Sequence, residues 1–468
     1  MSTFSGLNTA ASGLAAARRG MDVVGQNIAN QNTVGYTRQR LTTSAVGAPA
    51  QTGHFVPATV PGQGVSIDGI ARLGDALRDA RVRDTLAASG FWSTRALAAT
   101  TAETAMAEPT ADGLAARLSA FWAGWQDLAN TPDSPAAGAV VLGSAQELAG
   151  RLAEGYRAVA AQWADARRGV DGAVAQVNTA ADQIAALNRQ IRDAAASGVQ
   201  ANELIDQRGV LAQTLARTVG ARAVVEPDGT MTVRVDGNAL VSGTNARRLE
   251  ATGPASLDSG QDVSLRWADS GLVATLVDGE LGGTLAVLAP AGAGGTLAQV
   301  AASYSEVATA LADRVNAQHR AGVTASGEPG GDFFAVSPSG PAALGLSVVA
   351  TSFANLALAA PGSGAIDASN ADALSQLGTA TGSPDEIWAD RILRFGVATA
   401  ADVQRARLAE STAVTAASAQ QSVAGVDGDE ETVSLVAYQA SYQAAARMIS
   451  AIDEALDVLI NRTGIVGR

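Results

Sequence analysis

The amino-acid sequence predicts a mainly α-helical protein with β structure in its middle. Three observations lead to this prediction. Both ends carry apolar residues at coiled-coil spacing, long Ala-rich stretches lie between them, and the periodicity changes to two within residues 216–284. The expected fold therefore has terminal helices that pair as a coiled coil, a domain built as a bundle of long helices, and a β-hairpin with small β subdomains in the middle.

The N-terminal end has apolar residues in alternating steps of three and four, as at the a and d positions of a coiled coil. This seam consists of Leu7, Ala10, Leu14, Ala17, Met21, Val24 and Ile28. Gly6, Gly13 and Gly20 repeat every seven residues along the same segment. Each Gly costs about 1 kcal/mol of helix propensity relative to Ala. We therefore expect a helix that is weak alone and becomes ordered when another helix packs closely against it.

The C-terminal end has the same spacing. Its seam consists of Leu435, Tyr438, Tyr442, Ala445, Ile449, Ile452, Leu456 and Leu459. Each seam would be roughly 35 Å long as a helix, and two seams of matched length are expected to pair with each other. The alternative is an amphipathic helix at each end, packed on a globular core, because short heptads also occur in ordinary helices. Asp429, Glu430 and Glu431 precede the second seam, where carboxylates favour the helix dipole.

The segments between the seams are predicted in chain order. Residues 27–38 are dense in Asn, Gly and Thr, which is typical of a turn that ends the first helix, and a loop with a β-hairpin follows. Helices are expected over residues 75–88, 91–106, 135–197, 202–218, 297–318 and 400–421. A β-hairpin is expected around Asp228-Gly229, and the β region is expected to end at the glycines of ELGGTL.

The predicted organisation has four parts. Residues 1–32 and 428–468 form a terminal coiled-coil domain. Residues 33–215, 285–335 and 386–427 form a helical domain with an extended hairpin loop. Residues 216–284 form a β subdomain, and residues 336–385 form a small variable outer segment.

The composition excludes most enzyme chemistry. The 468 residues contain no Cys, and all 32 basic residues are Arg. Thiolate nucleophiles, Cys-based metal sites, Schiff-base lysines and the lysine of a nucleotide-binding P-loop are therefore excluded. The two histidines, His54 and His319, are far apart in sequence and lie outside any metal-binding motif. We expect no enzyme activity, no catalytic residues, no cofactor and no metal site.

Charge and hydropathy limit the partners. The net charge of −13 argues against nucleic acid, since binding phosphate backbones needs a clustered basic surface. No apolar run is as long as a membrane span. The first residues lack the basic and apolar regions of a cleaved secretory signal. We expect neither nucleic acid nor a membrane as a partner.

Both ends of the sequence resemble signatures of the bacterial flagellar axial proteins, the group of rod, hook and hook-associated proteins. The N-terminal match is SGLNTAASGLAAARRGMDVVGQNIANQNTVGYTRQR. Its most specific part is Asn27-Ile28-Ala29-Asn30, followed by Asn32, Thr33, Gly35, Tyr36 and Arg38. The C-terminal match is YQASYQAAARMISAIDEALDVLIN. Internal stretches such as GQGVSIDGIARLGDALRD, ANELIDQRGVLAQTLA and SVAGVDGDEE are similar to the FlgK family of hook-associated proteins. Val34 departs from the group, which usually has Pro there.

The resemblance implies a structural junction protein between flagellar hook and filament, which serves as an adaptor for filament growth. Its paired terminal helices would form the inner tube of the axis, and its middle would face outward. The implied partners are copies of itself in a ring, the hook protein, a second hook-associated junction protein and a flagellar export chaperone. The implied route is type III export to the extracellular flagellum without a cleaved signal peptide. The predicted assembly interface consists of the two seams and the turn that follows the first one.

Two other interpretations remain open at this point. The chain is another axial protein, of the hook or the rod, or it is an exported adhesin-like binding module whose β middle grips surface ligands. The adhesin interpretation predicts terminal helices that are already folded in the monomer.

Overall fold

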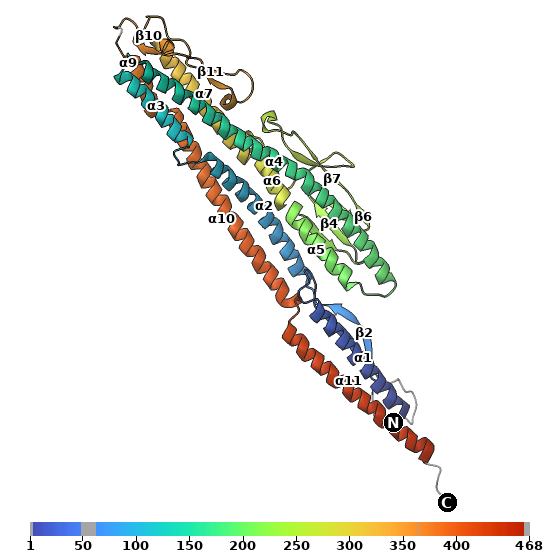
Figure 1. The fold of residues 1–468 in the computed structure, drawn as a ribbon. Helices are drawn as coiled ribbons and strands as arrows, with labels where there is room; N and C mark the ends of the chain where they lie inside the picture. The colour runs from blue at the N-terminus through green and yellow to red at the C-terminus, as the bar shows by residue number, and fades with distance from the viewer. Residues whose placement is uncertain (1–2, 48–61, 365, 463–468) are drawn as a thin grey trace, which may run out of the picture.

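The computed structural model describes residues 3–47, 62–364 and 366–462, which form an elongated molecule (Figure 1). In this part of the chain the fold is mainly α-helical with small antiparallel sheets, and the predicted fold class is confirmed. The helices are α1 (Thr3–Ala29), α2 (Ala76–Met106), α3 (Leu114–Asn130), α4 (Pro135–Ala196), α5 (Asn202–Val219), α6 (Gly279–Leu288), α7 (Thr296–Ala321), α8 (Ala342–Gly345), α9 (Ser369–Ser375), α10 (Pro384–Ala424) and α11 (Gly428–Asp457).

Two regions divide the length of the molecule. One is a bundle in which α2, α3, α4, α5, α6, α7 and α10 pack on one another. The other is a narrow pair in which α1 lies beside α11, and we call it the terminal pair (Figure 1). Residues 425–427 separate α10 from α11. Asp427 then starts α11, because its side chain accepts hydrogen bonds from the backbone N–H groups of Asp429 and Glu430.

The strands form small sheets attached to this helical frame. They are β1 (Gln39–Ala45), β2 (Val65–Arg72), β3 (Arg222–Val225), β4 (Met231–Val235), β5 (Asn238–Ser242), β6 (Asn245–Ala246), β7 (Leu249–Thr252), β8 (Ser264–Trp267), β9 (Val273–Ala274), β10 (Val323–Thr324), β11 (Phe334–Val336), β12 (Leu346–Val348) and β13 (Ala357–Ala359). The orders are β1-β2, β3-β4-β5-β6, β7-β8-β9, β10-β13 and β11-β12. The hairpin predicted around Asp228-Gly229 is the β3–β4 connection, so that prediction is confirmed.

Two predicted breaks at glycine are wrong. The glycines of ELGGTL lie inside α6, and α2 runs without interruption through Gly90. A Cβ on Gly283 would lie 2.6 Å from the carbonyl oxygen of Phe91, and a Cβ on Gly90 would lie 2.5 Å from the carbonyl oxygen of Arg217. These glycines therefore let neighbouring helices approach closely and do not end a helix.

The predicted start of the last bundle helix is also wrong. We expected helix from residue 400, but α10 begins at Pro384 and runs for 41 residues. Ser383 caps this start, because its hydroxyl accepts a hydrogen bond from the backbone N–H of Glu386 at 3.0 Å, and Pro occupies the first helical turn. The segment Ser-Pro-Asp-Glu is a helix-start signal that the apolar periodicity does not register.

The core lies within the bundle. Its largest fully buried apolar side chains are aromatic: Trp125, Trp163, Trp267, Trp388, Tyr304, Phe121, Phe333 and Phe334. The longest helix, α4, has 62 residues and would measure roughly 90 Å, and it contributes buried residues along most of its length. The bundle is therefore a long helical frame, and the terminal pair extends from one end of it (Figure 1).

Candidate assembly site

The terminal pair brings the two predicted seams together, but it buries them unevenly. On α1, Ala10, Ala17 and Val24 are buried, Leu7, Leu14 and Met21 are half-buried, and Ile28 is 40% exposed. On α11, the half-buried seam residues are Leu435, Tyr438, Tyr442, Ala445, Ile449, Ile452 and Leu456, and Leu459 is 53% exposed. Two helices alone cannot enclose each other, so the α11 seam residues keep part of their surface in contact with solvent.

The glycine line of α1 faces the partner helix at two of its three positions. A Cβ on Gly20 would overlap the ring of Tyr438, and a Cβ on Gly6 would lie 3.4 Å from Cδ1 of Ile452. Gly13 has nothing within 4 Å of the position where a Cβ would be. Gly20 therefore permits the close approach of the helices, whereas Gly13 weakens α1 without a compensating contact in this structure.

The side chain of Asn27 is the centre of a polar cluster at the base of the terminal pair. It is 1% exposed. Its amide nitrogen donates to the carbonyl oxygen of Gln39 and to Oε2 of Glu431, both at 2.9 Å. Its amide oxygen accepts from the hydroxyl of Tyr36 at 2.9 Å and from the backbone N–H of Gln39 at 3.0 Å. The four bonds join α1, the following turn, β1 and α11.

Arg38 joins the same cluster from the turn, and we call Asn27, Tyr36, Arg38, Gln39 and Glu431 the clasp. Glu431 is 2% exposed, and Nε of Arg38 lies 2.7 Å from its Oε1. Burial acts to lower the pKa of Arg38, but its hydrogen bonds and ion pairs with Glu430 and Glu431 outweigh that effect and raise it. The guanidinium therefore stays charged opposite the buried carboxylate.

Tyr36 is held as a neutral phenol. Its burial raises the pKa of the hydroxyl to about 12, and the nearby carboxylates of Glu203, Asp206 and Glu431 act in the same direction. A neutral hydroxyl is a hydrogen-bond donor, as the contact to Asn27 requires. The hydrogen bond from Tyr36 to Asn27 therefore keeps its direction at neutral pH.

A second set of contacts ties the clasp to the bundle. Asp206 of α5 accepts a hydrogen bond from the backbone N–H of Thr37 at 3.0 Å and from Nε of Arg72 at 2.5 Å. Asn202 donates to Oε1 of Gln39 at 3.2 Å and to the carbonyl oxygen of Ile70 at 2.9 Å. The direction of the terminal pair relative to the bundle is therefore set by side chains of α5.

The remaining predicted turn residues shape the chain between α1 and β1. The side chain of Asn30 accepts a hydrogen bond from the hydroxyl of Thr33 at 3.1 Å, and Gly35 has a φ of +80°, which favours glycine. Asn32 is exposed, as are Thr33 and Gly35. Val34 is 87% exposed and lines a cavity of about 650 Å³ between this turn, α4 and α5. These residues form a surface, in contrast to the enclosed clasp.

Sequence patterns did not identify several residues of this site. Glu431 was predicted only to favour the helix dipole, and Arg72, Asn202 and Asp206 were not singled out. One signal for Glu431 was present, because it lies four residues before Leu435 and so continues the apolar seam with a carboxylate. A charge at a seam position indicates a buried polar partner.

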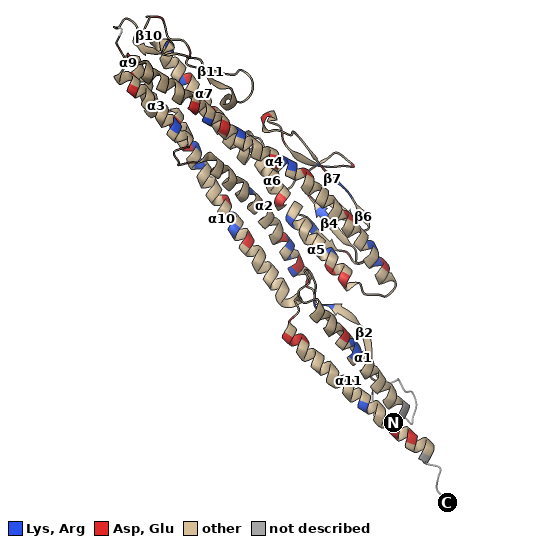
Figure 2. Cartoon of the chain, in the orientation of Figure 1, with Lys and Arg blue, Asp and Glu red and all other residues tan. Residues whose placement is uncertain are grey.

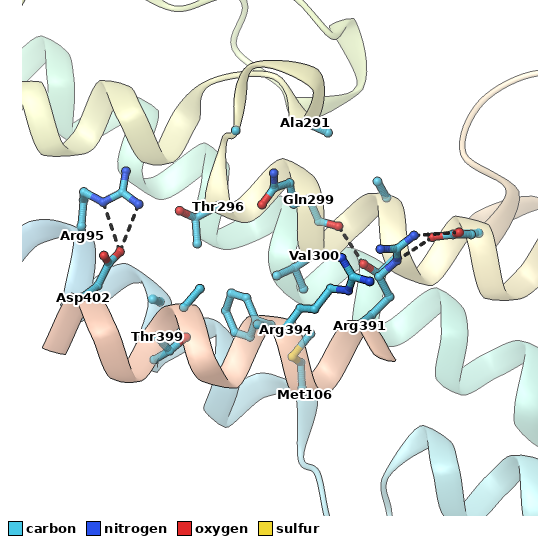
Figure 3. Close-up of a pocket in the computed structure, with 17 residues that line it drawn as sticks. Arg95, Met106, Ala291, Thr296, Gln299, Val300, Arg391, Arg394, Thr399 and Asp402 are labelled. Carbon is cyan, nitrogen blue, oxygen red and sulfur yellow. Dashed lines mark hydrogen bonds and ion pairs between the residues drawn. The ribbon is translucent and has the colours of Figure 1, made fainter. Parts of the chain in front are cut away.

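A cavity of about 510 Å³ lies between α2, α7 and α10 of the bundle (Figure 3). Its charged groups already neutralise one another: Arg95 lies 3.0 Å from Asp402, and Arg391 lies 2.9 Å from Glu306. Within residues 3–47, 62–364 and 366–462, no cluster of three or more acidic or His side chains is placed to hold a metal ion. Of the two histidines of the chain, His54 lies outside the residues that the structure describes.

These features define a class of protein: the fold and the terminal pair are those of a flagellar axial protein. The family model described as flagellar hook-associated protein FlgK helical domain matches residues 99–334, just over half of the chain. Residues 7–37 match the flagella basal body rod protein model, and residues 419–462 match the flagellar basal body rod FlgEFG protein C-terminal model. The chain belongs to the FlgK family of flagellar hook-associated proteins.

Individual relatives agree with this assignment. Flagellar hook-associated protein 1 of Bacillus subtilis is 28% identical over 511 aligned positions, which span all of both chains. Flagellar hook-associated protein 1 of Salmonella typhimurium is 30% identical over 339 positions, or 70% of this chain and 59% of the relative. The structure of the flagellar hook junction protein FlgK from Burkholderia pseudomallei has a TM-score of 0.65 at 18% identity, over 74% of this chain and 100% of that one. That structure has the same fold.

Family membership also decides between the open interpretations. The family consists of structural flagellar proteins that assemble with other hook and filament components, and the adhesin and the hook or rod interpretations are not favoured. Among the helices that the structure describes, none is long and apolar enough to cross a membrane.

Proposed function

We propose that this chain acts as a structural subunit between flagellar hook and filament and that the terminal pair is its assembly surface. One observation supports the assembly surface above all. The side of α11 that faces away from α1 is also apolar, and it is exposed to solvent. Its large side chains are Val433 (70% exposed), Val436 (59%) and Met448 (46%).

The spacing of these residues supports contact with a further helix. Val433, Val436, Ala440, Ala444, Ala451 and Ala455 follow one another at helical steps along the exposed side, opposite the seam that faces α1. Figure 2 shows α11 with acidic residues at its start and near its end, and few charges between them. An apolar stripe of this kind is stable in water when another helix covers it, and copies of the same chain in a ring would provide that helix.

The proposal extends to the neighbours and to the route. The hook protein would lie on one side of the ring and a second hook-associated junction protein on the other. A flagellar export chaperone would hold the chain before type III export, without a cleaved signal peptide, to the extracellular flagellum. In this arrangement residues 1–32 and 428–468 form the inner part, and residues 33–215, 285–335 and 386–427, with 216–284 and 336–385, face outward.

Complementation of a gene deletion tests the proposal. Cells that lack the gene should have hooks without normal filaments, and the wild-type gene should restore them. Val436→Asp should fold normally but fail to restore filaments, since it places a charge on the apolar stripe. The matched control is Val140→Asp, because Val140 is equally exposed (59%) on α4 of the bundle. Normal filaments in the deletion strain would refute the junction role, and normal filaments with Val436→Asp alone would refute the assembly surface.

A further inference from the structure

A buried histidine joins the far end of the bundle to the small subdomain that caps it. His319 lies in the last turn of α7 and is 1% exposed. The subdomain, which we call the tip, comprises residues 323–364 and 366–375, with β10 paired to β13 and β11 paired to β12. The imidazole ring contacts two separate segments of the tip, a loop and a strand.

Both ring nitrogens of His319 are used. Nδ1 lies 2.7 Å from the carbonyl oxygen of Gly331, and Nε2 lies 3.0 Å from the backbone nitrogen of Ala357. A carbonyl oxygen only accepts a hydrogen bond and a backbone N–H only donates one. The partners therefore require the neutral ring with its proton on Nδ1, since a proton on Nε2 would face the N–H of Ala357.

The surroundings of His319 would provide little stabilisation of the positive charge that a protonated ring carries. The ring packs near Trp125 of α3 and Phe333, with centroids 6.4 Å and 5.7 Å away, and Ala357 of β13 brings no charge. The charged neighbour is Asp332, which is half-exposed and already paired with Arg320 of α7. Burial lowers the pKa of His319, and the Gly331 carbonyl and Asp332 oppose this effect without cancelling it.

The segment that His319 holds is connected directly to the rest of the tip. The carbonyl oxygen of Ala357 accepts a hydrogen bond from the side chain of Asn370 at 2.7 Å, and Asn370 accepts one from Gln318 at 2.8 Å. Gly330 passes so close to the backbone of His319 that a Cβ there would overlap its carbonyl oxygen. A Cβ on Gly330 would also lie 2.7 Å from Cβ of Ala357, so the 329–334 segment packs directly on β13. A loss of the Nε2 contact frees Ala357 and therefore loosens β13 and the residue 329–334 segment together.

We propose that His319 is a pH-sensitive latch: its neutral ring fastens the tip to α7, and its protonation at acidic pH releases β13 and the 329–334 segment while the bundle stays folded. The sign follows from the chemistry of the two states. The folded state favours the neutral ring, so the latch is complete above the ordinary pKa of His, near 6.5, and is lost as the pH falls toward the lowered value. Between those two values the opening constant of the tip should rise about tenfold per pH unit.

Hydrogen exchange on the full-length protein at pH 7.5 and pH 5.5, corrected for intrinsic exchange rates, tests the latch. In the wild type, the opening constant measured for peptides that contain residues 329–334 and 355–359 should be about five- to tenfold higher at pH 5.5 than at pH 7.5. The opening constant measured for α4 peptides should be the same at both pH values. His319→Gln removes the titrating group and should flatten this dependence. The matched control His54→Gln, which replaces the other histidine of the chain, should keep it.

Isotope-labelled histidine in the wild-type protein gives an independent measurement, because the chain has two histidines. The His319 imidazole should titrate below pH 6.5 and should remain the Nδ1–H tautomer above that. Equal protection of the tip at both pH values, loss of the dependence in His54→Gln, or a His319 ring that titrates at or above its ordinary value would each overturn the proposal.

Discussion

The bundle and the terminal pair are both made of long Ala-rich helices, yet they differ in how far they bury their apolar side chains. In the bundle, α4 alone contributes 20 buried residues, and Trp125 and Trp163 are fully enclosed. In the terminal pair, the single buried residue of α11 within Gly428–Asp457 is a carboxylate, Glu431. The bundle therefore encloses its own core, whereas the terminal pair encloses a polar clasp and leaves the apolar side chains of α11 half-covered.

This difference indicates where stability comes from in each region. The bundle is stabilised by apolar burial within one chain and should fold as a free monomer. The terminal pair is held in place by the clasp, and in the proposed assembly most of the apolar stabilisation of α11 would become available when further helices cover it. Three substitutions test this contrast, and they are ordered by the size of the expected effect.

The largest effect is expected at Trp163. Trp163→Ala removes a side chain that is 1% exposed and donates to the carbonyl oxygen of Leu288 at 3.0 Å, so the free energy of unfolding should fall by about 3–5 kcal/mol. Leu435→Ala removes a half-buried side chain of α11 and should lower the free energy of unfolding of the monomer by about 1 kcal/mol or less. The same substitution should impair filament growth. Denaturant titration of the purified monomers measures both free energies. Equal losses of unfolding free energy in the two variants would contradict the conclusion that the bundle is stable alone and that the terminal pair depends on further helices.

An intermediate effect is expected from Arg38→Ala. The substitution leaves the carboxylate of Glu431 buried without its cation, which costs about 3–5 kcal/mol for fully buried pairs. Because Arg38 is 22% exposed and water screens it in part, we expect about 1–3 kcal/mol here. Hydrogen exchange should show faster opening of α1 and the start of α11, with an unchanged bundle. Arg391→Ala breaks a more exposed pair with Glu306 and should have no comparable local effect.

The smallest effect is expected from a pair of glycine substitutions on α1. Gly13→Ala meets open space, so it should increase helix stability by about 1 kcal/mol or less and raise the helical content of the monomer. Gly20→Ala gains the same propensity, but its Cβ overlaps the ring of Tyr438 and should separate the helices. Circular dichroism and hydrogen exchange of residues 3–29 distinguish them. If both variants behave alike, close packing at Gly20 does not matter.

Sequence patterns predict the terminal pair well because a seam records directly which side of a helix is apolar. The steps of three and four from Leu7 to Ile28 and from Leu435 to Leu459 follow from helix geometry alone. The long helix α4 is predicted from a nearly continuous Ala-rich stretch, because Ala has the highest helix propensity. These features depend on residues that are near one another in the chain.

The clasp could not be predicted in this way. The bond between Asn27 and Glu431 joins residues 404 positions apart, and no local pattern specifies which distant carboxylate an amide will meet. The positions of Gly90 and Gly283 inside helices could not be predicted for a related reason. A glycine that ends a helix and a glycine that admits a neighbouring helix look identical in sequence, and only tertiary packing separates them.

The placement of the chain ends has a practical consequence for labelling. The first helix begins at Thr3 and α11 ends at Asp457 at the same extremity of the molecule, on the proposed assembly surface (Figure 1). A fluorescent protein or affinity tag fused to either end would therefore be carried into the assembly itself. The exposed turn around Gly340 belongs to the tip, away from the terminal pair, and lies next to strands that are short and local. Insertion there would report on the protein while leaving the terminal pair untouched.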